Sequence, residues 1–410
     1  MPGSPAHHRP MTATYPAAKD DPATPMGEIY AEYPPMSKVV FPSGCEGWLV
    51  TRYDDVRLVF SDTRFSRNLL APGAPCLIEP GDFSTGDHSI LNMDPPDHTR
   101  LRKLSAQAFT VRRIAALRPR IQEIADDLLR AMAEHGPPVD LVEMFAFPLP
   151  TSVMCEILGV PFEGKERFRQ WSRVIVTPMA YSPAEVAQAR RDGAEDMAAL
   201  VAVKRVTPGE DLLSVLVHAR DEDGDRLTEA ELIDLATQLL LAGHETTVSL
   251  IATGIVLLSR NPEQFAALRA DPDLTTGAVE EIMRFDGPAD ASLLRVALED
   301  VELSGGLVRR GEAVLAHTGA ANRDESAFPG ASRFDIRRRN APQLGFGHGL
   351  HFCLGAALAR LEGEIAFRTL LDGLPGLDLA VPASDIVWRP SLSIRGPEAV
   401  PVTWTTTKSG

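Results

Sequence analysis

The sequence predicts a mainly α-helical fold with a small β-rich lobe. A strongly apolar stretch over residues 228–259 has the length of one long helix, and most of residues 95–204 carries apolar positions at helical spacing. Beyond Asp290, short alternating segments typical of strands replace that pattern. The chain shows no internal repeat and no linker-like change of composition. We therefore expect a single domain over residues 26–410, preceded by a flexible tail over residues 1–25 that is rich in Pro, Ala and polar residues.

The bulk composition of the 410 residues restricts the class of protein. Apolar residues make up 44% and charged residues 24%, and the net charge of −15 disfavours nucleic acid or an anionic membrane surface as a partner. The four cysteines form no C-x-x-C pair, which indicates a reducing compartment without disulfides. No apolar run approaches the ~20 residues of a membrane span, and the N-terminus has no apolar signal core. We expect a cytoplasmic protein without a membrane anchor.

The first elements are a strand, a long loop and a helix start. Residues 47–53 alternate apolar and polar side chains, as a half-buried strand does, and residues 70–90 are rich in Pro, Gly, Asp and Ser. Pro95 and Pro96 suit the start of a helix, which would place His98 and Arg102 four residues apart on one face. Taken alone, that pair is most simply a solvated basic helix face.

The long helix has clear end signals and an unusual middle. Thr228 and Glu231 form a capping box, and Asn261 with Pro262 ends the pattern. Its middle is apolar on nearly all sides, which indicates burial in a large core. It nevertheless contains the run AGHETT, in which a helix-interior glycine costs about 1 kcal/mol against alanine and an acidic side chain needs a partner or a function. We expect a local opening of the helix beside a reaction site.

The C-terminal half combines short strands, a turn and one more long helix. Glu281 and Arg284 form an i,i+3 pair, which contributes only a few tenths of a kcal/mol on an exposed helix. Gly305 and Gly306 predict a hairpin turn. Short strands are expected around residues 377–381 and 400–404, after a helix that begins near Cys353.

Cys353 lies in the run FGHGLHFCLG, between glycine-rich backbone and that last helix. Free backbone N–H groups and the helix dipole at this position favour a thiolate. A lone cysteine is most often a small buried side chain, and zinc with His348 and His351 would lack a fourth ligand. A nucleophile or a haem ligand are the other chemistries open to such a thiolate.

The spacing F-x-x-G-x-H-x-C-x-G resembles the haem-ligand loop of the cytochromes P450. The run AGHETT, the E-x-x-R pair, the segment FPGASRF and the segment DPPDHTRLRKL resemble further motifs of that family, in the family's order, over residues 26–405. The resemblance implies the cytochrome P450 fold, with haem held between the long central helix and the helix of the cysteine loop.

The resemblance also implies roles for individual residues. Cys353 would be the axial ligand of the haem iron, and Glu245 and Thr246 would relay protons to iron-bound oxygen. A structural network near the haem would comprise Glu281, Arg284 and Arg333. The remaining haem-binding residues would be propionate partners, an aromatic beside the ligand and a glycine that lets the backbone approach: His98, Arg102, Arg295, His351, Phe346 and Gly355.

The implied function is a monooxygenase with haem b (iron protoporphyrin IX) and O2 as co-substrate. It would insert one oxygen atom into a mid-sized hydrophobic molecule, by hydroxylation or epoxidation, and a secondary metabolite fits best. A peroxide-driven peroxygenase and a non-catalytic haem protein that binds a ligand remain alternatives. The pocket residues expected from helical spacing and from neighbouring segments are Gln238, Leu241, Ala242, Ala291, Leu293 and Ile394.

Electrons would have to arrive from a separate ferredoxin and ferredoxin reductase, because the chain has no flavin or iron–sulfur motif of its own. From Arg100 to Arg120 there are seven basic and no acidic residues, and residues 337–339 are three arginines. Such clusters suit the docking of an acidic donor, although a solvated face explains them equally well.

Overall fold

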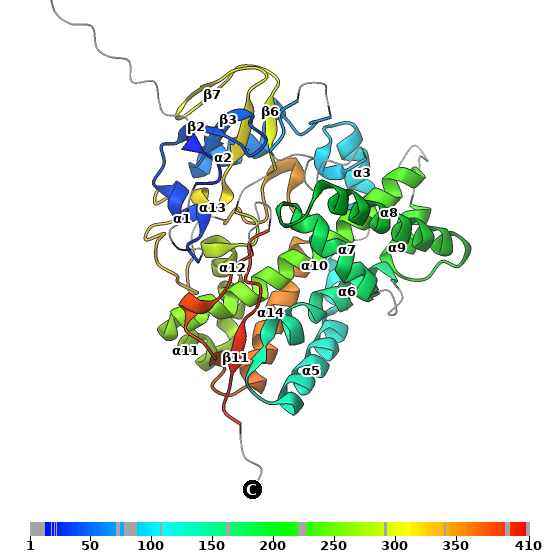
Figure 1. Cartoon of the computed structure of the whole chain (residues 1–410), viewed down its shortest axis with the longest axis vertical. Coiled ribbons are helices and arrows are strands. Elements are labelled where there is room, and N and C mark those ends of the chain that lie inside the picture. Colours follow the sequence, from blue (N-terminus) through cyan, green and yellow to red (C-terminus); the bar gives the residue numbers. More distant parts are fainter. Residues whose placement is uncertain are drawn as a thin grey trace, which may run out of the picture.

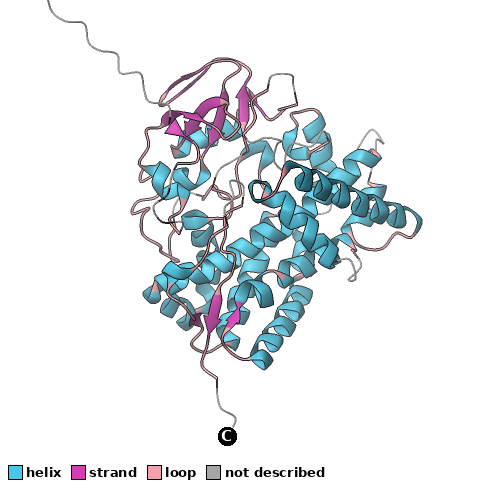
Figure 2. Cartoon of the chain, viewed as in Figure 1, coloured by secondary structure: helices cyan, strands magenta, loops and turns pink. Residues whose placement is uncertain are grey.

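The computed structural model describes residues 13–17, 19, 21, 23–70, 74–77, 88–106, 109–160, 165–219, 227–290, 293–339, 342–389 and 394–406. Helices form most of the molecule, and the strands gather mainly in one lobe, at the top of Figure 2. The predicted mainly α fold with a small β-rich lobe is confirmed.

The helices follow the apolar patterns in the sequence. Figure 1 shows helices on both sides of the central helix α10. In chain order they are α1 (Met26–Ala31), α2 (Tyr53–Ser61), α3 (Asp97–Ala106), α4 (Val111–Ala116), α5 (Arg118–His135), α6 (Pro148–Leu158), α7 (Lys165–Val176), α8 (Pro183–Val206), α9 (Leu212–His218), α10 (Glu229–Arg260), α11 (Pro262–Ala270), α12 (Thr275–Asp286), α13 (Thr318–Ala321) and α14 (Ala356–Gly373).

Helix α10 runs through the middle of the molecule and packs on α6, α8, α12 and α14. The predicted capping box is present, because the Thr228 side chain accepts from the Glu231 N–H and the Glu231 carboxylate accepts from the Thr228 N–H. Among the described helices, α10 alone has the length and apolar composition to cross a membrane, and 78% of its apolar window is buried inside the protein. It is one continuous helix through AGHETT.

The strands form three sheets. The largest has the order β1-β2-β3-β9-β6-β4, the second β10-β11-β5, and the third is the hairpin β7-β8. The hairpin is present as predicted, but its turn lies at Ser304 and Gly305, and Gly306 already pairs with Leu303 as the first residue of β8. Their bounds are β1 (Ala13–Thr14), β2 (Met36–Val40), β3 (Glu46–Val50), β4 (Phe65–Ser66), β5 (Val139–Asp140), β6 (Arg295–Ala297), β7 (Val301–Leu303), β8 (Gly306–Val308), β9 (Ala313–Ala316), β10 (Asp378–Leu379) and β11 (Pro401–Thr403).

The boundary of the predicted N-terminal tail is wrong. Strand β1 lies within residues 1–25, yet it pairs in parallel with β2. Tyr15, directly after β1, is buried, with its ring stacked on Tyr30 at 5.7 Å between centroids and edge-on to Phe41. A large aromatic side chain buried in this way contributes enough apolar area to hold the segment against the sheet.

The buried network around Glu281 is present with one different member. Arg284 donates to both carboxylate oxygens of Glu281 at 2.7 Å. The second guanidinium on Glu281 belongs to Arg338, at 3.2 Å, whereas the Arg333 side chain is exposed and only its backbone carbonyl accepts from Arg284 and Arg338. The prediction for Arg333 is therefore wrong. The turn after Asp335, whose N–H donates to Glu281, brings Arg338 back toward the carboxylate.

Candidate active site

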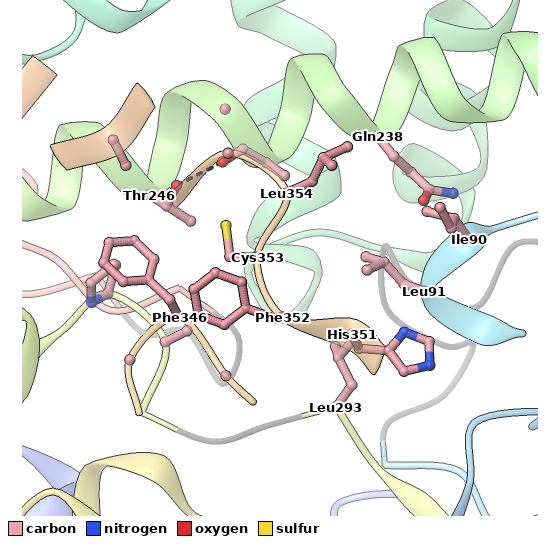
Figure 3. Close-up of a pocket in the computed structure, with 18 of the residues that line it drawn as sticks. Ile90, Leu91, Gln238, Thr246, Leu293, Phe346, His351, Phe352, Cys353 and Leu354 are labelled. Carbon is pink, nitrogen blue, oxygen red and sulfur yellow. Dashed lines mark hydrogen bonds between the residues drawn. The ribbon is translucent and has the colours of Figure 1, made fainter. Parts of the chain in front are cut away.

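A cavity of about 310 Å³ lies between α10 and the loop that carries Cys353. Figure 3 shows the Cys353 thiol pointing into this pocket, with Thr246 of α10 above it and Phe346 and Phe352 beside it. Residues that are more than 100 positions apart in the sequence thus meet at one site. The pocket wall is mostly apolar, which suits an organic ligand.

The cysteine loop is shaped by glycines and one backbone hydrogen bond. Gly347 and Gly349 have φ of +73° and +69°, a left-handed conformation that favours glycine. This turn lets the Cys353 N–H donate to the Phe346 carbonyl at 2.8 Å. Gly355 follows as the N-cap of α14 and lines the pocket, so Cys353 lies just before a helix N-terminus, as predicted.

The groups around the Cys353 thiol have opposite effects on its pKa. Burial raises the pKa of the free thiol, while a hydrogen bond from the Gly355 N–H and the charges of Arg102 and Arg360 lower it less strongly. The hydrogen bond from the helix start thus favours the thiolate, as expected, and desolvation opposes it. A cation bound at the sulfur would reverse this balance.

Phe346 forms part of the pocket floor beside the thiol. It is buried, and the Arg360 guanidinium lies over its ring at 4.3 Å from the centroid. Arg360 in turn pairs with Glu280 of α12. The Phe346 ring is therefore in contact with the Arg360 guanidinium of α14.

Thr246 faces the pocket from α10. Its hydroxyl donates to the Ala242 carbonyl at 2.6 Å, one turn back, instead of packing against the core. A Cβ at Gly243 would meet the end of the Met154 side chain of α6, which would then have to shift. The predicted opening of the helix is thus limited to side-chain hydrogen bonding within a continuous α10.

Glu245 is buried beside the pocket rather than in its wall. Its carboxylate pairs with Arg389 at 2.6 Å and with His244 Nε2 at 3.3 Å. Burial alone would raise the pKa of Glu245, but the hydrogen bonds and charges of His244 and Arg389 lower it to about 2. Arg389, which also donates to the Ser249 hydroxyl at 2.7 Å, was not predicted, since nothing in its local sequence marks it.

A cluster of basic side chains lies at one edge of the pocket. His98 and Arg102 of α3, Arg295 of β6 and His351 of the cysteine loop all line it, as expected. The His98 and His351 rings are 4.1 Å apart between centroids, and Arg102 donates to the Phe352 carbonyl at 2.6 Å. Buried Arg67, which was not predicted, adds a further charge beside Arg295.

Burial and the neighbouring positive charges lower the pKa values of these basic side chains. Burial and Arg67 lower the pKa of Arg295 to about 9, and burial with His98, Arg295, Arg67 and Arg102 lowers the pKa of His351 to about 2. His98 Nδ1 is buried without a hydrogen-bond partner in the described part of the chain. Such a cluster fits an anionic ligand with two or more carboxylates, because buried charges require partners.

Four of the six predicted substrate-pocket residues line the cavity: Gln238, Ala242, Leu293 and Ile394. Leu241 does not; it is buried in the core, because a residue five positions before Thr246 points about 140° away on a helix. Ala291 lies outside the described residues. Leu239, seven positions before Thr246, lines the pocket and could have been found from helical spacing, whereas Ile90, Leu91, Phe109 and Met154 come from elements whose packing the sequence does not reveal.

Among the residues that the structure describes, no group of three or more His, Cys, Asp and Glu side chains is arranged to hold a metal ion.

The chain belongs to the cytochrome P450 family. A family model described as Cytochrome P450 matches residues 20–373. The chain is 46% identical to the cytochrome P450 monooxygenase PikC of Streptomyces venezuelae, over 94% of this chain and 91% of that protein. It is 45% identical to the mycinamicin IV hydroxylase/epoxidase of Micromonospora griseorubida, over 92% of this chain and 94% of that protein.

The solved structures that this chain resembles also include cytochrome P450 enzymes. The LnmA cytochrome P450 hydroxylase of Streptomyces atroolivaceus S-140 superimposes with a TM-score of 0.86 at 44% identity, covering 96% of this chain and 100% of that chain. The protein is thus a P450 monooxygenase, an oxidoreductase that uses haem and O2 and inserts one oxygen atom into a hydrophobic organic substrate.

Proposed function

We propose that the Cys353 thiolate would ligate the iron of haem b and that His98, Arg102, Arg295 and His351 would bind its propionates. The observation that carries this proposal is the meeting of two features in one cavity. The Cys353 thiol points into the cavity opposite Thr246, and a cluster of basic side chains from α3, β6 and the cysteine loop lies at its edge. When bound, the haem supplies the O2 chemistry, and the protein supplies orientation, protons and exclusion of water.

In this proposal, Thr246 and Glu245 deliver protons. The Thr246 hydroxyl is held by the Ala242 carbonyl at the pocket wall, where it would accept a proton and pass one into the cavity. Glu245 is ionised at neutral pH because its pKa is lowered to about 2. It therefore carries a proton only transiently, and its partner Arg389, whose side chain is 16% exposed, lies on the side from which solvent protons can arrive.

The structure narrows the surface that we propose for an electron-donating ferredoxin. Arg100, Arg118 and Arg120 pair with Glu231, Glu364 and Glu156 within the chain, and Arg338 is part of the Glu281 network. Arg112 and Arg113 of α4 stay exposed, and α4 packs on α14, which follows the cysteine loop.

The cysteine loop also exposes Leu350, so cations and an apolar side chain occur together on the Cys353 side. A ferredoxin reductase would reduce the ferredoxin after each electron transfer.

The substrate class and location are part of the same proposal. PikC and the mycinamicin IV enzyme are actinomycete proteins, and the second acts on a mycinamicin, as its name states. We infer that this chain likewise oxidises a bacterial secondary metabolite, by hydroxylation or epoxidation, in the cytoplasm. The apolar pocket wall supports this inference.

The test is the spectrum of the reduced carbon monoxide complex. The wild-type protein should show the red-shifted Soret band of a thiolate-ligated haem, and Cys353→His should bind haem without that band. A normal band in Cys353→His would disprove the ligand assignment. Turnover that needs ferredoxin and reductase, rather than hydrogen peroxide alone, would exclude the peroxygenase alternative, and absence of any oxidised product from a library of hydrophobic compounds would favour the ligand-binding alternative.

A further inference from the structure

One polar group on the apolar side of the pocket has no partner. Gln238 lies on α10, lines the cavity and is only 7% exposed. Its Oε1 atom is buried without a hydrogen-bond partner among the described residues. Figure 3 shows its amide at the end of the pocket beside Ile90 and Leu91, away from Cys353.

An amide at this position is costly unless something binds it. A buried carbonyl oxygen without a hydrogen bond destabilises a protein substantially, whereas an apolar side chain of similar size would pack without that loss. The neighbours on the same wall are apolar, namely Leu235, Leu239, Ile90 and Leu91. A leucine would therefore fit these surroundings better than glutamine does.

The spacing between Gln238 and Thr246 sets a minimum length for a substrate that reaches both residues. The two residues are eight positions apart on one continuous helix, which corresponds to about 12 Å along its axis. Ala242 and Leu239 line the wall between them. A single substrate that reaches both ends must therefore be an elongated molecule or a large ring.

We propose that Gln238 is a specificity-determining residue that accepts a hydrogen bond from the substrate. The substrate then carries a hydroxyl or N–H donor at one end, about 12 Å from the carbon that is oxidised near Thr246. This inference rests on the proposed function, since it takes the reaction centre to lie between Thr246 and Cys353.

The matched variants are Gln238→Leu and Gln122→Leu. Gln122 is a half-buried glutamine of α5 whose Nε2 donates to Asp126 and Thr369 at 2.8 Å, so its amide is satisfied within the chain. The thermal unfolding of both haem-loaded variants is compared with that of the wild type. Gln238→Leu should raise the melting temperature, and Gln122→Leu should lower it.

Binding is measured on the same preparations by the shift of the haem Soret band. The probes are two pairs that differ only in the donor: 17β-oestradiol with its dimethyl ether, and 1-dodecanol with dodecyl methyl ether. The wild type should bind the hydroxyl member of a pair about tenfold more tightly than the ether. Gln238→Leu should lose this preference and Gln122→Leu should keep it.

Three results would overturn the inference. They are equal binding of hydroxyl and ether by the wild type, no shift with any of the four probes, and a lower melting temperature for Gln238→Leu. The carbon monoxide spectrum of the same samples separates this failure from that of the proposed function, because a thiolate band shows that the haem site is intact whatever the probes do.

Discussion

The carboxylate of Glu245 accepts a hydrogen bond from the Arg389 guanidinium at 2.6 Å, across 144 positions of sequence. This pair joins the central helix to the segment before the last strand. Because Glu245 is buried, its charge depends on Arg389 and His244 for compensation.

Replacing Arg389 by methionine should destabilise the protein and shift its acid sensitivity. The Glu245 carboxylate then loses a cation, so its pKa rises from about 2. A carboxyl with a depressed folded-state pKa stabilises the fold above its unfolded value of about 4.3, and this contribution is lost as the pH falls toward the folded-state pKa. We expect a loss of about 3 kcal/mol in free energy of unfolding at pH 7, and a smaller further loss on acidification, because the folded-state pKa of Glu245 then lies closer to its unfolded value.

Thermal unfolding between pH 4 and pH 8 measures both effects. Arg368→Met is the control, since its partner Asp273 is almost fully exposed and the pair contributes little. Equal stability of Arg389→Met and Arg368→Met at pH 7 would show that Glu245 does not need its partner.

Thr246→Ala should separate oxygen consumption from product formation. The hydroxyl bonded to Ala242 is lost from the pocket wall, so we expect most reducing equivalents to end in hydrogen peroxide. Thr246→Ser keeps the hydroxyl and should restore most of the coupling. The measurement is the ratio of product to NADPH consumed, with Thr253→Ala, a buried threonine of the same helix that does not line the pocket, as the control. Unchanged coupling in Thr246→Ala would remove this residue from proton delivery.

Arg338→Leu and Arg333→Leu should behave differently. The first leaves the Glu281 carboxylate with one guanidinium and should cost about 2–3 kcal/mol. The second removes an exposed side chain and should cost about 0.5 kcal/mol or less. Urea unfolding of the two variants compares these costs directly. A larger loss in Arg333→Leu would reinstate the network that the sequence predicts.

Glu362 of α14 should make stability fall as the pH rises. It is fully buried, neither oxygen has a full hydrogen bond within the described chain, and burial raises its pKa from 4.5 to about 8, opposed only in part by the Thr247 hydroxyl. A raised folded-state pKa of an acid means that the fold binds the proton more tightly than the unfolded chain does. Between these two pH values the protein should therefore lose about 1.4 kcal/mol per pH unit from this group.

Glu362→Gln should remove that slope, so the variant should exceed the wild type in stability by a few kcal/mol near pH 8. Glu364→Gln, on the same helix and paired with Arg118, should leave the slope unchanged. Parallel stability curves for the wild type and Glu362→Gln would mean that Glu362 is ionised in the fold.

The sequence predicts best what depends on local pattern. The bounds of α10 follow from a capping box and a terminal Asn-Pro, and the β7-β8 hairpin follows from turn chemistry to within one residue of its turn. The meeting of Cys353 with Thr246 could be expected only from the family resemblance, because no local rule brings residues 107 positions apart together.

The predictions fail where a contact depends on how distant segments of the chain are brought together. Arg338 replaces Arg333 because of the turn after Asp335, and Glu245 meets Arg389 because the C-terminal segment returns to α10. The N-terminal boundary was misplaced because burial of Tyr15 depends on Tyr30 and Phe41, which lie in other elements.

The ordered N-terminal segment limits how far this enzyme can be shortened or fused to a redox partner. The carbonyl of Ala23 accepts from Arg395 at 2.7 Å, Arg395 pairs with Asp286 at the end of α12, and its backbone N–H donates to the Pro288 carbonyl. Pro288 and Ile394 are themselves pocket residues. Truncation to Met26 would thus remove the Ala23 carbonyl that binds Arg395 next to the pocket residue Ile394. An electron-transfer domain is better attached ahead of Ala13 or after the last residue.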